Sequence, residues 1–210
     1  MEVLLAESPS VFLAPTLKIK VFLVTPRIFY SKGVFLMGKN NNNGKNNLKF
    51  LTHTALIAAA YAALTYAFAF MSYGQVQFRV SEILVLFAFI EPRYGLGLVL
   101  GCILANFTSP LGVIDVVVGS FATLVAILYI AAIRKTFGYN RKSMYLASLG
   151  PVISNAVFVG LELTYLFQTP FLLNAMYVAI GEFVVVTLVG TQVVNAVMKN
   201  SALTERLSIN

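Results

Sequence analysis

Hydrophobic residues predominate in long runs along the chain from residue 51 onward, and shorter polar segments separate these runs. The six runs cover residues 51–71, 80–90, 94–107, 113–133, 144–167 and 171–198. A membrane-spanning helix needs about 20 apolar residues, so the four longer runs are long enough to cross a membrane. The two shorter runs predict short helices that are tilted or partly buried in a bundle. The pattern therefore predicts an all-α integral membrane protein, built as a six-transmembrane-helix bundle.

Proline and glycine mark the interruptions between and within these runs. Pro92 lies in the turn Glu91-Pro92-Arg93, between the two short runs, and would end or kink a helix there. The segments 109–112 and 168–170 are further expected turns. The pair Gly150-Pro151 lies inside the fifth run, where it predicts a kinked helix.

Composition agrees with a membrane location. Hydrophobic residues make up 59% of the 210 residues and charged residues only 11%, whereas a soluble domain carries roughly 25% charged residues. The length leaves room for one bundle of ordinary size. The net charge is +7, but the basic residues do not gather as a nucleic-acid-binding patch. We therefore expect membrane lipid, and no nucleic acid, as a partner.

Residues 1–49 do not share the pattern of the rest of the chain. Apolar and basic residues alternate there, Pro15 and Pro26 interrupt them, and neither apolar stretch is long enough to span a membrane. The asparagine-rich segment 38–50 has too little apolar surface to pack. We expect residues 1–49 to be a poorly ordered extension. Our hypothesis is that Met37 is the natural start, which N-terminal sequencing of the native protein would test.

Basic residues lie on one side of the predicted bundle. They are Lys39, Lys45, Lys49, Arg93, Arg134, Lys135, Arg141, Lys142, Lys199 and Arg206. An even number of helices and the positive-inside rule then place both ends of the chain in the cytoplasm, with the helices in the plasma membrane. The membrane domain is thus 50–198, and 199–210 is a cytoplasmic tail. Arg79, at the edge of an outer loop, is the exception to the rule.

The stretch from Tyr73 to Arg93 changes character in its middle. Its first half is polar and includes Arg79 and Glu82, and residues 83–90 are apolar. The two charges admit two explanations. They could form a local ion pair between neighbours on a helix, or the segment could fold inward and line a ligand site, because a charge at membrane depth is costly unless it is paired or faces a cavity.

Four of the eight acidic residues lie inside predicted spans: Glu82, Asp115, Glu162 and Glu182. Carboxylates at membrane depth indicate function, yet each also has a structural explanation. Asp115 could cap its helix. Asn155 and Glu162, two turns apart, could bond between helices. Glu182 could pair with Arg79 or be protonated.

These side chains also favour one ligand site near the outer ends of the helices. The candidate substrate-binding residues are Gln77, Arg79, Glu82, Asn106, Asp115, Asn155, Glu162 and Glu182. An acidic pocket suits a cation or a ligand rich in N–H donors, because charge-assisted hydrogen bonds to carboxylates are strong. No cluster of His and Cys indicates a metal site. The sequence also lacks a phosphate-binding loop and a catalytic constellation, so we expect no cofactor and no catalysis by this chain.

Small residues repeat every four positions along the first predicted helix. They are Ala55, Ala59 and Ala63, with Ala58 and Ala62 beside them. This spacing lets another helix approach closely. The approaching helix could belong to the same bundle or to a different membrane protein, so these alanines are candidate partner-docking residues.

Several segments together resemble one known family. YGQVQFRVSEIL (73–84), GCILANFTSPLGVIDVVVGSFATL (101–124), PVISNAVFVGLEL (151–163) and the Gly181-Glu182 step are similar to the QueT family. Its members are the substrate-binding S components of energy-coupling factor (ECF) transporters for queuosine precursors. The resemblance covers residues 50–198 and not the N-terminal extension.

This resemblance implies a six-helix bundle of the S-component type, whose alanine-rich first helix docks on a transmembrane T component. It implies that two ATP-binding cassette ATPases on other chains drive transport, and that this chain is a non-catalytic binding subunit. It also implies a deazaguanine ligand, of the aminomethyl form. Glu162 or Glu182 would then bind the base edge, with Glu82 and Asp115 nearer the amine.

Other functions compete with this interpretation. A standalone ion-coupled or facilitative carrier of a small cationic or N–H-rich metabolite would use the same carboxylates. A membrane enzyme lacks a catalytic constellation, and a purely structural subunit leaves the carboxylates unexplained. Uptake by this chain alone, without other subunits, would reject the S-component interpretation.

Overall fold

The structure, a computed structural model, describes residues 41–73 and 76–207. Over these residues the chain forms helices and turns and no strand, which confirms the all-α fold. The expected extension of residues 1–49 lies mostly outside the described residues, as does the hypothesis about Met37. Its last residues, from Asn41, form the beginning of the first helix.

Four helices among the described residues are long and apolar enough to cross a membrane. They are Asn47–Ala67, which is most of α1 (Asn41–Ala67), then α5 (Val113–Phe137), α6 (Arg141–Phe167) and the stretch Phe171–Lys199. They coincide with the four long hydrophobic runs, and the chain is an integral membrane protein.

The stretch Phe171–Lys199 is continuous but not uniform. It consists of α7 (Phe171–Glu182), the π-helix η4 (Phe183–Gly190) and α8 (Thr191–Lys199). A π-helix is rare and often lies at a functional site. Here it begins directly after Glu182, one of the candidate site residues.

The two shorter runs form shorter helices. Residues 80–90 start as the 3₁₀-helix η2 (Val80–Leu86) and end as α3 (Phe87–Ile90), and the next run forms α4 (Gly95–Asn106). The predicted break lies between them at η3 (Pro92–Tyr94). Neither run reaches the length of the four long helices, so the described residues support four spans by length and not the predicted six.

Helix boundaries follow local caps. α5 continues beyond the predicted end at 133 to Phe137, where Gly138 has a φ of 77° and ends the helix. α6 begins after Asn140, whose side chain accepts a hydrogen bond from the Ser143 N–H at 3.0 Å. α6 continues through Pro151, where the sequence predicts a kink. The short helices α2 (Ala69–Ser72) and α9 (Ser201–Leu207) complete the fold.

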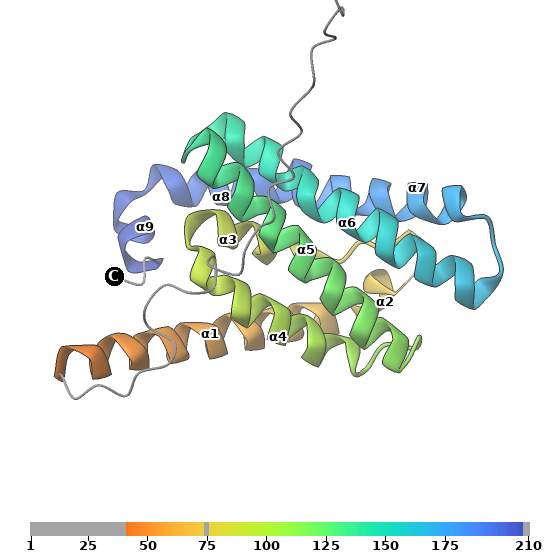
Figure 1. Cartoon of the computed structure of the whole chain (residues 1–210), viewed down its shortest axis with the longest axis horizontal. Coiled ribbons are helices and arrows are strands. Elements are labelled where there is room, and N and C mark those ends of the chain that lie inside the picture. The colour runs from red at the N-terminus through yellow and green to blue at the C-terminus, as the bar shows by residue number, and fades with distance from the viewer. Residues whose placement is uncertain (1–40, 74–75, 208–210) are drawn as a thin grey trace, which may run out of the picture. The chain divides into compact units, whose positions relative to one another are not determined.

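The helices pack in neighbouring pairs. α5 and α6 run side by side, α7 packs on α6, and α1 packs on α4 (Figure 1). Glycines allow the closest of these approaches. A Cβ added at Gly101 of α4 would lie 2.7 Å from the Tyr61 Cβ and 2.9 Å from the Ala58 carbonyl oxygen of α1. The backbones of α1 and α4 therefore touch where a larger side chain would separate them.

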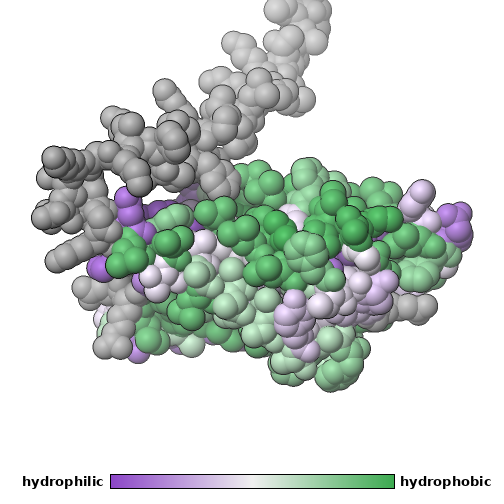
Figure 2. Space-filling model, turned by 90° about the horizontal axis from the view of Figure 1, so that it is seen from below, coloured by the Kyte–Doolittle hydropathy of each residue, from purple (hydrophilic) through white to green (hydrophobic). Residues whose placement is uncertain are grey.

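The bundle is apolar both inside and outside. Phe89, Leu98, Ile130 and Met144 are buried in one core, while Phe121, Leu161 and other large hydrophobic side chains are exposed. Hydrophobic residues also cover much of the face seen in Figure 2. Exposed apolar side chains on long helices are what contact with lipid requires.

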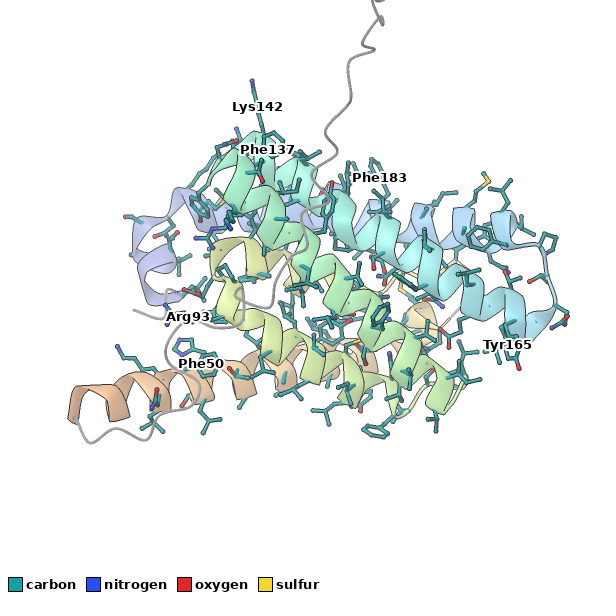
Figure 3. The ribbon with its side chains drawn as sticks, in the orientation of Figure 1. Phe50, Arg93, Phe137, Lys142, Tyr165 and Phe183 are labelled. Atoms are coloured by element: carbon teal, nitrogen blue, oxygen red, sulfur yellow. The ribbon has the colours of Figure 1, made fainter. Side chains whose placement is uncertain are left out.

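Charged side chains favour one end of the bundle. Arg93 and Lys142 lie toward one end and Tyr165 toward the other (Figure 3). At the first end, the Arg134 guanidinium donates a hydrogen bond to the Ile90 carbonyl at 2.8 Å and joins α5 to α3. The candidate site residues described next come from the opposite halves of their helices.

Candidate functional site

Four carboxylates and one guanidinium form a buried group, which we call the carboxylate cluster. Its members are Arg79, Glu82, Asp115, Glu162 and Glu182, and each is at most 4% exposed. Glu162 interacts electrostatically with Asp115 and Arg79, and Glu182 interacts with Glu82 and Arg79. The structure thus brings together charged residues from four separate hydrophobic runs.

Close backbone contacts hold two parts of the cluster in place. A Cβ added at Gly181, beside Glu182, would overlap the Gln77 carbonyl oxygen, so α7 touches the loop that leads to Arg79. Gln77 is itself buried. A Cβ added at Gly119 would lie 2.5 Å from the Asn106 amide nitrogen. Only glycine leaves room for the Gln77 backbone beside Gly181 and for the Asn106 side chain beside Gly119.

Arg79 forms an ion pair with a residue far away in sequence. Its guanidinium lies 3.8 Å from a carboxylate oxygen of Asp115 and 5.7 Å from the centre of the Tyr73 ring. Arg79 therefore forms its ion pair with Asp115 and not with its near neighbour Glu82. Its charge still interacts with Glu82 over a longer distance. Asp115 lies in the first turn of α5, but neither of its carboxylate oxygens makes a hydrogen bond to a described residue, so it does not cap the helix in this way.

Two amides support carboxylate-bearing elements. The Asn155 side chain donates to Glu182 Oε1 at 2.9 Å and also interacts with Glu82. The Asn106 side chain donates to the backbone carbonyl of Asp115 at 2.9 Å and so ties the end of α4 to the start of α5. The hydrogen-bond partner of Glu182 is therefore Asn155, whereas the sequence suggested Arg79.

Hydroxyl groups of α1 reach the cluster, and sequence reasoning missed them. The Tyr61 hydroxyl donates to Glu82 Oε1 at 2.6 Å, and the Thr65 hydroxyl donates to Ser81 Oγ at 2.7 Å. The two residues are one turn apart and fully buried. The sequence pattern that could have indicated them is a pair of hydroxyl side chains four residues apart, on one face of an otherwise apolar helix segment.

Tyr73, in the loop that follows α2, packs its ring against the Arg79 guanidinium of the cluster. Its hydroxyl donates to the Ala105 carbonyl at 2.9 Å. Burial raises the pKa of the Tyr73 phenol, against the opposing effect of a hydrogen bond with Thr108 and of the nearby Arg79 charge. The phenol therefore remains a neutral hydrogen-bond donor beside Arg79.

Many polar atoms of the cluster and of Asn106, which is bonded to Asp115, have no hydrogen-bond partner in the described part of the chain. They are Arg79 Nε, Glu82 Oε2, Asn106 Oδ1, both carboxylate oxygens of Asp115, both of Glu162, and Glu182 Oε2. Buried polar atoms are normally hydrogen-bonded, because leaving them unpaired is costly. Seven of these eight atoms are oxygens that accept hydrogen bonds, so the arrangement suits a ligand that presents N–H donors and positive charge. The described residues hold no group of three or more His, Cys, Asp or Glu side chains able to bind a metal ion.

The candidate docking alanines divide into two sets. Ala58 and Ala62 are buried, and the backbone of Ala58 touches Gly101 of α4. Ala55, Ala59 and Ala63 are exposed on the adjacent stripe of α1. The alanine repeat therefore has two parts. Ala58 and Ala62 pack inside the bundle, and Ala55, Ala59 and Ala63 form an accessible face of small residues.

Comparisons with known proteins identify relatives. The sequence profile of the QueT transporter family matches residues 51–199. The chain is 36% identical over 138 residues to the curated protein "Queuosine precursor transporter QueT" of Lactococcus lactis subsp. cremoris (strain MG1363), and the match covers 61% of this chain and 80% of that relative. No solved structure matches the chain significantly. Every member of the carboxylate cluster lies inside the segment that the family profile matches.

The buried ion pair of Arg79 yields a stability prediction. Arg79→Met leaves Asp115 and its neighbouring carboxylates without their cation, and we expect it to destabilise the folded protein by about 3 kcal/mol or more. Arg93→Met removes an ion pair of 3.1 Å to Glu91, but the Arg93 side chain is 47% exposed, so we expect a loss of about 1 kcal/mol or less. Thermal unfolding in detergent measures both.

The double variant Arg79→Met/Asp115→Asn serves as the control for this prediction. It also removes the uncompensated negative charge, so it should recover part of the lost stability. Equal melting temperatures for Arg79→Met and Arg93→Met would show that Arg79 does not stabilise the cluster.

Proposed function

Because the chain belongs to the QueT transporter family, we propose that it is the substrate-capturing membrane subunit of a transporter that imports a queuosine precursor. The name of the L. lactis relative supports this substrate class. The observation that carries the proposal is the set of unpartnered carboxylate oxygens buried together in the carboxylate cluster.

The ligand we propose is a deazaguanine with an aminomethyl arm. Four carboxylates face a single guanidinium in the cluster, so positive charge and N–H donors on a ligand offset the excess negative charge. A guanine-like edge offers neighbouring N–H donors, and the arm offers an ammonium. The proposed substrate-binding residues remain Gln77, Arg79, Glu82, Asn106, Asp115, Asn155, Glu162 and Glu182.

Hydrogen bonding within the cluster distinguishes the roles of the carboxylates. Both oxygens of Glu162 lack a protein partner, and no cation lies within 4 Å of this side chain among the described residues. Two parallel hydrogen bonds from the N–H groups of the ligand need a carboxylate with both oxygens free. We therefore assign Glu162 to the guanine-like edge of the ligand. Glu82 and Glu182 each use one oxygen for Tyr61 or Asn155 and keep one. The one remaining oxygen of Glu82 and the one of Glu182 can together accept hydrogen bonds from the ammonium of the aminomethyl arm.

Transport requires other chains in this proposal. The partners are a transmembrane T component and two ATP-binding cassette ATPases, which supply ATP hydrolysis while this chain remains non-catalytic. The T component docks on the face of α1 that exposes Ala55, Ala59 and Ala63. Small exposed side chains at four-residue spacing allow close contact between membrane helices.

The proposal includes six membrane crossings. The segments 80–90 and 94–107 then cross as short helices, in addition to the four long ones. Both chain ends are cytoplasmic, because Arg93, Arg134 and Lys142 lie at the helix ends and connections that an even number of crossings places on one side. The hydrogen bond of Arg134 to the Ile90 carbonyl supports this by joining the ends of α5 and α3.

The topology can be tested with single cysteines. In intact cells, Asn140→Cys should be shielded from a membrane-impermeant thiol reagent, and Thr169→Cys should react. The native Cys102 is buried, so the parent protein serves as the unlabelled control. The reverse pattern would place the carboxylate cluster near the cytoplasm and remove the outward-facing site.

Ligand binding can be tested by calorimetry on the purified protein. Aminomethyl-deazaguanine should bind, and Glu162→Gln should weaken binding by about tenfold or more, because a charge-assisted hydrogen bond contributes about 1.5–3 kcal/mol. Glu91→Gln, a matched change in the turn beside Arg93, should leave the affinity within about twofold. Heat signals from another vitamin class, and none from guanine-like bases, would overturn the substrate assignment.

Partner docking can be tested by enlarging one exposed alanine. Ala59→Leu should reduce association with the T component and ATP-driven uptake, because close helix approach is blocked, while ligand binding in detergent stays unchanged. Ala196→Leu, at an exposed position of α8, is the matched control and should leave both intact. If Ala59→Leu loses ligand binding as severely as Glu162→Gln, α1 does not serve as the docking face. Uptake by this chain alone would instead favour a standalone carrier.

A further inference from the structure

α1 contributes a side chain to the carboxylate cluster from its second half, residues 55–67, which is almost entirely apolar. Tyr61 is fully buried and donates its hydroxyl to Glu82 Oε1 at 2.6 Å. This is the distance range of a strong hydrogen bond from a hydroxyl to a carboxylate. The bond joins α1 to η2 across 21 residues of sequence.

The ring of Tyr61 has little freedom to move. Its Cβ lies 2.7 Å from the position where a Cβ on Gly101 would stand, so α4 packs directly against the base of the side chain. The next turn of α1 is also fixed, because the Thr65 hydroxyl donates to Ser81 Oγ at 2.7 Å, one residue before Glu82. A rigid donor of this kind determines how the acceptor carboxylate is oriented.

The other oxygen of Glu82 is the one left for a ligand. Glu82 Oε2 is buried and has no hydrogen-bond partner in the described part of the chain. Arg79 and Asn155 also interact with the Glu82 carboxylate. With Tyr61 bonded to Oε1, the carboxylate cannot rotate away from its present orientation without breaking a strong hydrogen bond.

We propose that Tyr61 is a positioning residue of the substrate site, which fixes the Glu82 carboxylate so that Oε2 is presented to the ligand. This inference rests on the proposed function for the identity of the ligand, and on geometry alone for the role of the hydroxyl. Tyr61 acts through Glu82 and does not itself bind the ligand.

The first test removes only the hydroxyl. Tyr61→Phe keeps the packed ring, and its affinity for aminomethyl-deazaguanine should fall by about tenfold. Tyr66→Phe is the matched control, because Tyr66 lies on the same helix and its hydroxyl donates to the Leu104 carbonyl at 2.6 Å, away from Glu82. It should bind within about twofold of the parent. Unchanged affinity in Tyr61→Phe, or an equal loss in both variants, overturns the proposal.

A double-mutant cycle separates positioning from a general structural role. In the background of Glu82→Gln, Tyr61→Phe should cause little further loss, because the carboxylate that it orients is gone. In the background of Glu162→Gln, the fold-losses of ligand affinity from the two substitutions should multiply. Full multiplication of the losses with Glu82→Gln would mean that Tyr61 acts elsewhere.

A ligand-free measurement keeps this inference distinct from the proposed function. The infrared difference spectrum of Tyr61→Phe against the parent should contain a carboxyl-group band that is absent in the Glu82→Gln background. A spectrum without that band overturns the positioning role, whatever the ligand is. Failure of the parent protein to bind the deazaguanine, with the band present, overturns only the substrate assignment.

Discussion

The polar half of this bundle depends on one buried guanidinium. Arg79 is the only Lys or Arg side chain that is buried among the described residues, and it interacts with all four carboxylates of the cluster. Carboxylates that face each other in a medium of low dielectric constant repel strongly. A cation among them allows α5, α6, α7 and η2 to bring their acidic side chains together. The cluster keeps more acidic than basic side chains, an excess that the proposed cationic ligand would offset.

The sequence predicts the members of this cluster better than their partners. Glu82, Asp115, Glu162 and Glu182 stand out because charged residues are rare inside apolar runs. Pairing is a tertiary property, however, and the neighbour rule that joins Arg79 to Glu82 gives no indication of Asp115. Tyr61 has only a weak signal in the sequence, the Thr65 hydroxyl one turn away on the same helix, and its bond to Glu82 is a tertiary contact that spacing does not indicate. The Pro92 break follows from backbone chemistry and was predictable, whereas the 3₁₀ and π geometries depend on packing.

The two sides of α1 show a second limit of sequence patterns. Four-residue spacing produces two adjacent stripes of alanine, and nothing in their spacing distinguishes them. The distinction comes from Gly101 of α4, which accommodates Ala58 and Tyr61 and leaves Ala59 and Ala63 exposed. The same helix thus bears the proposed docking face outside and a hydroxyl bonded to Glu82 inside. A partner that displaces α1 would act directly on the proposed ligand site.

The π-helix between α7 and α8 has a consequence for how this family can evolve. Each residue of an α-helix adds about 100° of rotation, and the wider turn of a π-helix accommodates an inserted residue. Glu182 before η4 and Val194 after it are both buried, so the number of residues between them fixes their relative orientation. Selection would then tolerate exchanges among apolar side chains in 183–190 and remove insertions and deletions. The lengths of this segment in related genes measure that constraint.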